Sequence, residues 1–242
     1  MATSLQPTES PDLESSSDEY ANRFAGSVGR YFLEVQRNLV HEMMPAAEDC
    51  RVLDVGGGHA QLAPSLVNAG FDVTVFGSDD SCCERLDREV GAGQYSFASG
   101  SLLDLPFAED SFDVVLGFRL LPHLNHWMPF LRELCRVASA RVIIDFPSVQ
   151  SINWFSTHFF AWKQKVETNA RPFNCFRNAD VAKAFDALGF KIVRSAGQFV
   201  MPMALHRLVG LAVFSRSTEW LARLVGLTAL FGSPVIVQAD CS

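Results

Sequence analysis

The sequence predicts an α/β protein with a doubly wound, mostly parallel sheet of seven strands and helices on both faces. Apolar segments with the period of strands alternate with segments that have the period of helices, which is typical of such sheets. The run at 112–117 is almost continuously apolar and indicates a strand buried on both faces. Apolar residues make up 48% of the 242 residues and charged residues only 19%, so we expect a large core.

Each predicted element has its own pattern. Strands are expected where short β-branched or apolar runs end at glycine, proline or acidic residues, namely at 51–55, 71–76, 95–98, 112–117, 141–146, 191–200 and 234–238. Helices are expected where apolar residues recur every three or four positions, including 20–45, 130–137, 179–188 and 203–230.

The domain organisation follows from these elements. Residues 1–18 are rich in Ser, Glu, Asp and Pro, so we expect a disordered N-terminal tail. Residues 19–242 are expected to form one domain. It carries a helical, aromatic insertion at about 148–178 and a second helical insertion at about 203–230.

Charge and cysteine usage exclude several classes of protein. A net charge of −7 argues against a nucleic-acid-binding protein, which would present a basic face. The six cysteines form no C-x-x-C pair and no metal-ligand spacing, so we expect reduced thiols, no metal site and a cytoplasmic location. The N-terminus has no secretory signal pattern, and no run of eighteen apolar residues predicts a spanning helix.

The segment 51–63 predicts a nucleotide site, because a buried strand ends on Asp54 and three glycines and a helix follows directly. Glycines allow a sharp turn and close approach of a ligand, and the helix N-terminus offers free N–H groups. The spacing excludes two common sites. Gln61 stands where a dinucleotide fingerprint has its third glycine, and no lysine follows as in a P-loop.

Three motifs in order carry a family resemblance. D-x-G-x-G at 54–58 resembles motif I of the class I S-adenosylmethionine (SAM)-dependent methyltransferases. The stretch 100–115, GSLLDLPFAEDSFDVV, resembles that family's GDA-x-x-LPF-x-D-x-SFD-x-V, and 117–137 resembles its LHHL…LREMARV segment. The chain thus resembles the small-molecule "type 11" methyltransferases, which implies a Rossmann-like sheet and SAM as the cofactor.

The resemblance assigns cofactor binding to Asp54, Gly56, Gly58, Asp79, Ser101 and Leu102. Asp79 would accept the ribose hydroxyls, although counting without gaps places Gly77 at the usual position of that acid. Ser101 stands where the family has the aspartate that binds the adenine amino group, and a hydroxyl accepts less strongly than a carboxylate. Leu102 would pack on the adenine ring.

The expected reaction is methyl transfer from SAM to a hydrophobic small molecule, such as a quinone, a polyketide-like compound or a lipid metabolite. Catalysis would come mainly from positioning for an in-line displacement. His123 after the fourth strand is a candidate base, and Arg119 could bind a carboxylate or phosphate of the acceptor. Trp154 and Phe159 of the aromatic insertion are candidate acceptor contacts, or they simply cover the edge of the sheet.

Other interpretations stay open at this point. The departures at Gly77 and Ser101 fit a SAM-binding regulatory protein or partner without catalysis, and a similar sheet also serves oxidoreductases that use NAD. The apolar segment 203–230 could lie on a membrane surface, pack on the core or form a homodimer contact.

Overall fold

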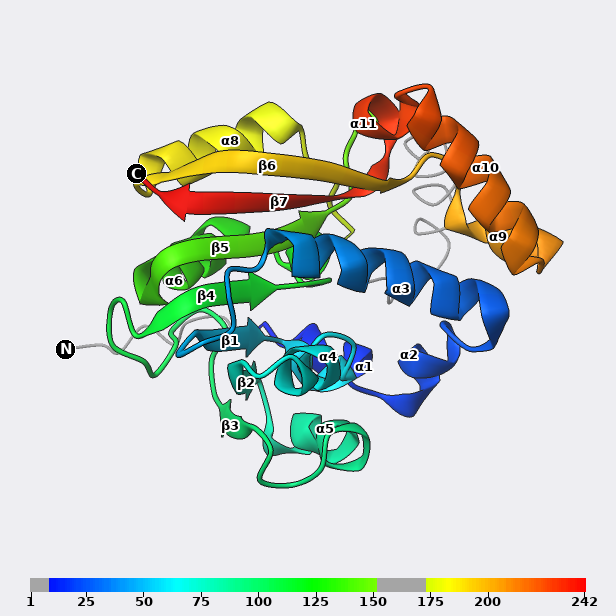
Figure 1. Ribbon diagram of the computed structural model, residues 1–242. Helices are drawn as coiled ribbons and strands as arrows, with labels where there is room; N and C mark the ends of the chain where they lie inside the picture. Colours follow the sequence, from blue (N-terminus) through cyan, green and yellow to red (C-terminus); the bar gives the residue numbers. More distant parts are fainter. Residues whose placement is uncertain (1–8, 152–172) are drawn as a thin grey trace.

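A computed structural model describes residues 9–151 and 173–242 of the chain. One seven-stranded sheet contains β1 (Arg51–Val55), β2 (Asp72–Gly77), β3 (Ser96–Ser99), β4 (Phe112–Gly117), β5 (Ala138–Phe146), β6 (Phe190–Phe199) and β7 (Ser233–Cys241). Their order is β3-β2-β1-β4-β5-β7-β6, and only β7 runs antiparallel to its neighbours (Figure 1). The prediction of a doubly wound, mostly parallel sheet is confirmed.

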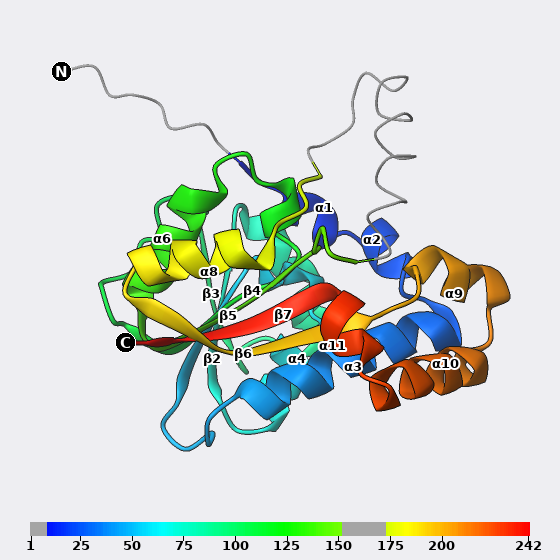
Figure 2. The same cartoon turned by 90° about the horizontal axis from the view of Figure 1, so that it is seen from above.

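Helices cover both faces of this sheet (Figure 2). In chain order they are α1 (Asp12–Ser15), α2 (Asp18–Asn22), α3 (Gly26–Met43), α4 (Ala63–Asn68), α5 (Glu84–Glu89), α6 (Trp127–Val137), α8 (Asn178–Ala187), α9 (Met203–Val209), α10 (Ala212–Leu224) and α11 (Leu227–Phe231). Side chains of β1 alternate between two cores. Leu53 packs with α6 and α8 on one face, and Val52 packs with α3, α4 and α5 on the other.

Glycines divide two segments that the sequence predicts as continuous helices. The predicted helix 20–45 is α2 followed by α3, and Gly26 at their junction has a φ of +78°. The predicted helix 203–230 is α9, α10 and α11, separated at Gly210 and Gly226, which also have positive φ. An αL glycine ends a helix at little steric cost, and the apolar period alone does not reveal that break.

Residues 9–18 differ from the expected disordered tail. They form α1 and the start of α2, and Asp12 is fully buried. Polar contacts with backbone N–H groups distant in the sequence hold these residues in place. A segment of low hydrophobicity can still make such contacts, so its composition alone did not reveal them. Most of the aromatic insertion at 148–178, with Trp154 and Phe159, lies outside the described residues. In the described ranges, no helix combines the length and apolar character needed to cross a membrane.

The topology places a crevice at the carboxyl ends of β1 and β4. From β1 the chain winds through β2 and β3 in one direction, and from β4 it winds to β5 in the other. Ligands of doubly wound sheets bind outside the carboxyl ends of the strands at such a reversal. The glycine loop after β1 lies at this edge, together with the ends of β2, β4 and β5.

Candidate active site

The glycine loop follows β1 directly and turns sharply. Gly56 has a φ of +73°, and its N–H donates to the carbonyl oxygen of Phe76 in β2 at 2.7 Å. A Cβ on Gly56 would lie 2.7 Å from the side chain of Leu120, which follows β4. A side chain at position 56 would therefore meet both backbone strain and a close neighbour, so the tight path of this loop requires glycine.

Asp54, the last polar residue of β1, carries a buried carboxyl group without a partner. Its side chain is fully buried, and neither carboxyl oxygen has a hydrogen-bond partner among the described residues. Burial raises the pKa of Asp54 to about 7. An isolated buried carboxylate is costly and is retained where it serves a ligand or a reaction.

Further buried polar atoms near the loop also lack partners in the described part of the chain, among them Nε2 of His59 and Oγ of Ser78. The Nδ1 atom of His59 accepts from the Gln61 N–H at 3.2 Å, so the neutral ring carries its proton on Nε2. Burial lowers the pKa of His59 to about 3, which keeps the ring neutral. With Asp54, the carboxyl ends of β1 and β2 thus offer an acceptor, a donor and a hydroxyl to a polar ligand.

Asp79 lies beyond β2, at the start of the 3₁₀ turn η2 (Asp80–Cys83). Its Oδ1 accepts from the Ser81 N–H at 2.9 Å and from the Ser81 hydroxyl at 2.6 Å, and these bonds lower the pKa of Asp79. The carboxylate is exposed and caps the turn. Its binding to ribose stays a prediction.

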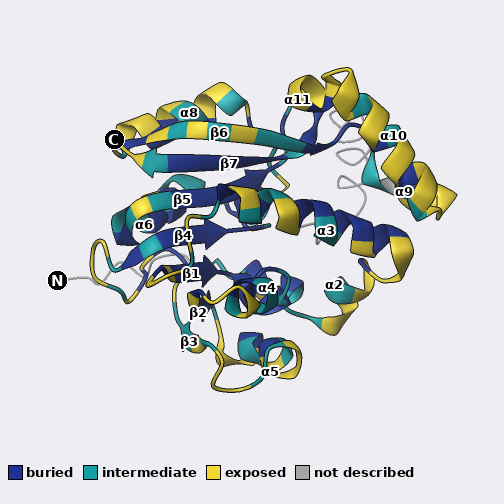
Figure 3. Ribbon diagram, in the orientation of Figure 1, coloured by how far each residue is buried: buried dark blue, intermediate teal, exposed yellow. Residues whose placement is uncertain are grey.

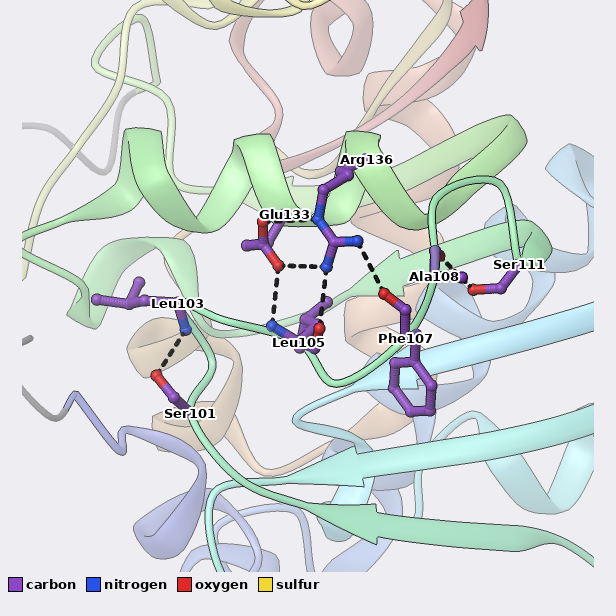
Figure 4. Close-up of polar contacts among 8 residues, drawn as sticks. All are labelled: Ser101, Leu103, Leu105, Phe107, Ala108, Ser111, Glu133 and Arg136. Carbon is purple, nitrogen blue, oxygen red and sulfur yellow. Dashed lines mark hydrogen bonds and ion pairs between the residues drawn. The ribbon is translucent and has the colours of Figure 1, made fainter.

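Ser101 and Leu102 begin the loop after β3. Figure 4 shows Ser101 in this loop. The Ser101 hydroxyl accepts from the Leu103 N–H at 3.2 Å, and the Leu102 side chain is fully buried. The hydroxyl thus turns back on its own loop. The structure places both residues beside the end of β2, because β2 and β3 pair in parallel up to Gly77 and Ser99.

Two residues of α6 hold the same loop in place (Figure 4). Glu133 accepts from the Leu105 N–H at 2.9 Å. Arg136 donates to the carbonyl oxygens of Leu105 and Phe107 at 2.9 and 2.8 Å and pairs with Glu133. The motifs at 100–115 and 117–137 are separate in the sequence, but in the fold side chains of the second bind the backbone of the first.

A second feature of this edge is an apolar cavity of about 210 Å³ at the carboxyl ends of β4, β5 and β6. Its wall consists mainly of aromatic and other apolar side chains with a few polar groups, namely Tyr20, Phe24, Phe32, Gln36, Arg119, Pro122, His123, Asp145, Phe146, Pro147, Phe173, Gln198, Phe199, Met203 and Pro234. A pocket of this composition suits a largely apolar small molecule oriented by few polar contacts.

Contacts with neighbouring residues of the chain fix the position of Arg119 at the cavity. Its backbone has a φ of +61°, and its N–H donates to Oδ1 of Asp145 at 2.6 Å. The guanidinium donates to Gln36 at 2.9 Å and to the Tyr20 hydroxyl at 3.4 Å, and it stacks 4.2 Å from the ring centre of Phe24. The hydrogen-bond acceptors of the guanidinium itself, Gln36 and Tyr20, are neutral, and its nearby positive charge helps to lower the pKa of Asp145.

Asp145 is a site residue that the sequence reasoning missed. It lies at the end of β5, is 5% exposed and lines the cavity. Burial raises the pKa of Asp145 to about 6, although the Arg119 N–H lowers it in part. The sequence does carry a signal, since Asp145 is the one charged residue in the otherwise apolar run 142–146.

His123 also lines this cavity, from the turn η3 (Leu121–His123) after β4. Its ring lies edge-to-face against Phe173 with the ring centres 5.7 Å apart. The structure thus brings His123 and Arg119 to one cavity, and their roles toward an acceptor stay predictions.

Comparison with known proteins agrees with this geometry. Residues 53–144 match the family model described as a methyltransferase domain. This central segment, less than half of the chain, is thus similar to methyltransferase domains. The magnesium protoporphyrin IX methyltransferase of Synechocystis PCC 6803, solved with bound S-adenosylhomocysteine, has a similar fold, with a TM-score of 0.64 and 17% identity over 93% of this chain and 94% of that one.

The curated relatives match less than half of this chain. An O-methyltransferase (rstn1) of Aspergillus nomiae is 29% identical over 104 residues, or 40% of this chain and 46% of the relative. A ubiquinone/menaquinone biosynthesis C-methyltransferase of Sinorhizobium fredii is 28% identical over 116 residues, or 44% and 45%. The chain spans less than half the length of these relatives. The family-model match, residues 53–144, includes the glycine loop and leaves out most of the residues that line the cavity.

Proposed function

We propose that this protein transfers a methyl group from SAM to a hydrophobic small molecule held in the cavity at the ends of β4, β5 and β6. The observation that carries the proposal is the pairing of two sites at one edge of the sheet. A polar site with an unpaired buried carboxyl group lies after β1, and an apolar cavity lies beside it. This arrangement suits a polar cofactor next to an apolar acceptor.

The residues at the first site fit the cofactor. The Asp54 carboxylate has no donor of its own, and SAM carries an amino group that would supply one. Gly56, Gly58, Asp79, Ser101 and Leu102 would contact the rest of the cofactor, as the family resemblance implies. When bound there, SAM supplies an electrophilic methyl group. The chain then contributes mainly orientation, which on its own can give roughly 7–11 kcal/mol of the barrier.

The second site determines the acceptor. Its aromatic wall favours a quinone, a polyketide-like compound or a lipid metabolite, and the relatives named above include a quinone C-methyltransferase. Arg119 would orient an acidic group of the acceptor. Asp145 and His123 would accept a proton where the acceptor is a hydroxyl or an acidic carbon. Trp154 and Phe159, outside the described residues, stay candidate acceptor contacts.

A transfer assay tests the proposal. The protein is incubated with methyl-labelled SAM and either the hydrophobic or the polar fraction of a metabolite extract, and products are identified by mass spectrometry. Labelled product is expected from the hydrophobic fraction, and Asp145→Asn should reduce it while Asp186→Asn, an exposed aspartate of α8, should not. Product from the polar fraction alone would contradict the assignment of the acceptor.

A second candidate is a SAM-binding regulatory or partner protein without transfer. The observation that favours it is Ser101, whose hydroxyl replaces a carboxylate and turns back on its own loop. Calorimetry with SAM separates the cases in combination with the transfer assay, because this candidate gives binding with no labelled product from either fraction.

We further propose that 203–231 contacts a membrane surface, from which a hydrophobic acceptor would enter. Helices α9, α10 and α11 are largely exposed (Figure 3), and their apolar side chains are exposed with them, including Leu208 at 83%, Val213 at 77% and Leu230 at 68%. The charged residues of the segment are Glu219, which is buried, and three arginines, of which Arg216 pairs with Glu34 of α3. Met203 at the start of α9 also lines the cavity.

Such a surface, apolar with exposed positive charge, suits anionic lipid in an otherwise acidic protein. Co-sedimentation should show binding to vesicles of phosphatidylcholine with phosphatidylglycerol, and Leu208→Glu should reduce it. Val193→Glu on β6 changes another exposed apolar residue, 58% exposed, away from this surface and should have no effect. A homodimer lost in Leu208→Glu, without vesicle binding, would instead assign the surface to a second copy.

A cytoplasmic location is part of the proposal and is supported by the six free cysteines.

A further inference from the structure

Residues 9–16 lie across the carboxyl edge of the sheet, where the cofactor is proposed to bind. Glu9 accepts from the N–H groups of Asn125 and His126 at 2.8 and 3.0 Å, beyond the end of β4. Three residues later, the Asp12 carboxylate accepts from the Ser78 N–H at 2.6 Å, beyond the end of β2. The segment therefore runs from the end of β4 to the end of β2 and crosses the end of β1, which lies between these two strands in the sheet.

The segment fills space at the glycine loop itself. Oγ of Ser16 lies 2.3 Å from the place where a Cβ on Gly58 would stand, so Ser16 rests directly on the glycine backbone. Asp12 is fully buried, and its second carboxyl oxygen has no partner in the described part of the chain. Figure 1 shows α1 just beyond the arrowhead of β1. A ligand that approaches Gly58 this closely would meet Ser16.

We propose that residues 9–16 are an intramolecular occluding segment that competes with SAM for the glycine loop. This inference rests on the proposed cofactor site. The segment is suited to displacement because its attachment is polar. The carboxylates of Glu9 and Asp12 hold the segment, and Asp18, just after it, pairs with Arg85 and Arg88 on α5. These contacts bury few large apolar side chains. Each carboxylate can exchange its protein donor for water, so release costs little buried apolar area.

Competition lowers the apparent affinity for SAM by the fraction of molecules in which the segment is displaced. Asp12→Ala removes the central contact, so this variant should bind SAM roughly 10- to 100-fold more tightly than the unaltered chain, the range expected for loss of one charge-assisted hydrogen bond. Glu19→Ala, an exposed acid of α2 with the same change of charge, should leave the affinity unchanged. Isothermal titration calorimetry on the full chain measures all three proteins.

Hydrogen exchange of the unaltered chain gives an independent readout. Saturating SAM should increase exchange in residues 9–17 and decrease it at 54–60. Weaker SAM binding by Asp12→Ala, or protection of 9–17 by SAM, would overturn the proposal and show the segment to be part of the cofactor site. If neither the unaltered chain nor Asp12→Ala binds SAM, the proposed function itself fails.

Discussion

Asp54→Asn should make this protein more stable at high pH and at the same time weaken its binding of SAM. The pKa of Asp54 is raised from its ordinary value near 3.8 to about 7 because the carboxyl group is fully buried without a partner. The folded chain therefore holds this proton more tightly than the unfolded chain. Between about pH 4 and pH 7 the folded state binds more protons, so its free energy of unfolding falls as the pH rises.

The size of the effect follows from the pKa. Each pKa unit corresponds to 1.36 kcal/mol, so ionising Asp54 in the folded chain costs up to about 4 kcal/mol by pH 8. Asparagine has the same shape and does not titrate. Its constant cost, the burial of an amide, is the same at all pH values. The difference in free energy of unfolding between Asp54→Asn and the unaltered chain should therefore shift in favour of the variant by up to about 4 kcal/mol between pH 4 and pH 8.

Urea unfolding at a series of pH values measures this shift, and calorimetry at pH 8 measures SAM affinity. SAM binding should weaken roughly 10- to 100-fold, as for a lost charge-assisted hydrogen bond. Asp72→Asn is the matched control, since Asp72 is exposed at the opposite end of the sheet. A difference in stability that does not change with pH, or an unchanged SAM affinity, would refute the assignment of Asp54 as a buried ligand of the cofactor.

Three further predictions concern other parts of the chain. The methyl-transfer rate should rise as the pH passes about 6, where Asp145 ionises, and Asp145→Asn should lower the rate at least 10²-fold and remove this pH step, as measured by a pH–rate profile. Glu219→Ala leaves buried His206 and the N–H groups of Val200 and Met201 without their acceptor, so urea unfolding should show a loss of about 3–5 kcal/mol, against no loss for exposed Glu48→Ala. Arg136→Ala should increase hydrogen exchange at 101–108, and Arg136→Lys should not restore protection, because a lysine cannot reach both carbonyl oxygens in the fixed fork geometry of arginine.

The sheet was predictable because each strand carries a local signal. A buried parallel strand is a short apolar run, and 51–55 and 112–117 match β1 and β4 in full. The antiparallel direction of β7 carries no such signal, because it depends on the path of the connecting segment 203–231. The breaks at Gly26, Gly210 and Gly226 were hidden for a related reason, since a glycine inside an apolar period is compatible with either a continuous or a divided helix.

The candidate site was predictable where a motif lies within one loop. Asp54 and the glycines are adjacent in sequence, so their spacing alone indicated a nucleotide site. Asp145 and Asp12 gain their surroundings from residues distant in the chain, such as Arg119 and Ser78. Asp12 in particular lies in a segment whose composition indicates disorder, and only the fold brings it to the end of β2.

The position of the bound cofactor tests the central claim most directly. A crystal structure of the full chain with S-adenosylhomocysteine should place the ligand at the carboxyl ends of β1 and β2. There, the Asp54 carboxylate should accept a hydrogen bond from the ligand's amino group, and residues 9–16 should be displaced from Gly58. A ligand bound away from the glycine loop, or one that leaves both Asp54 oxygens without a donor, would contradict the account.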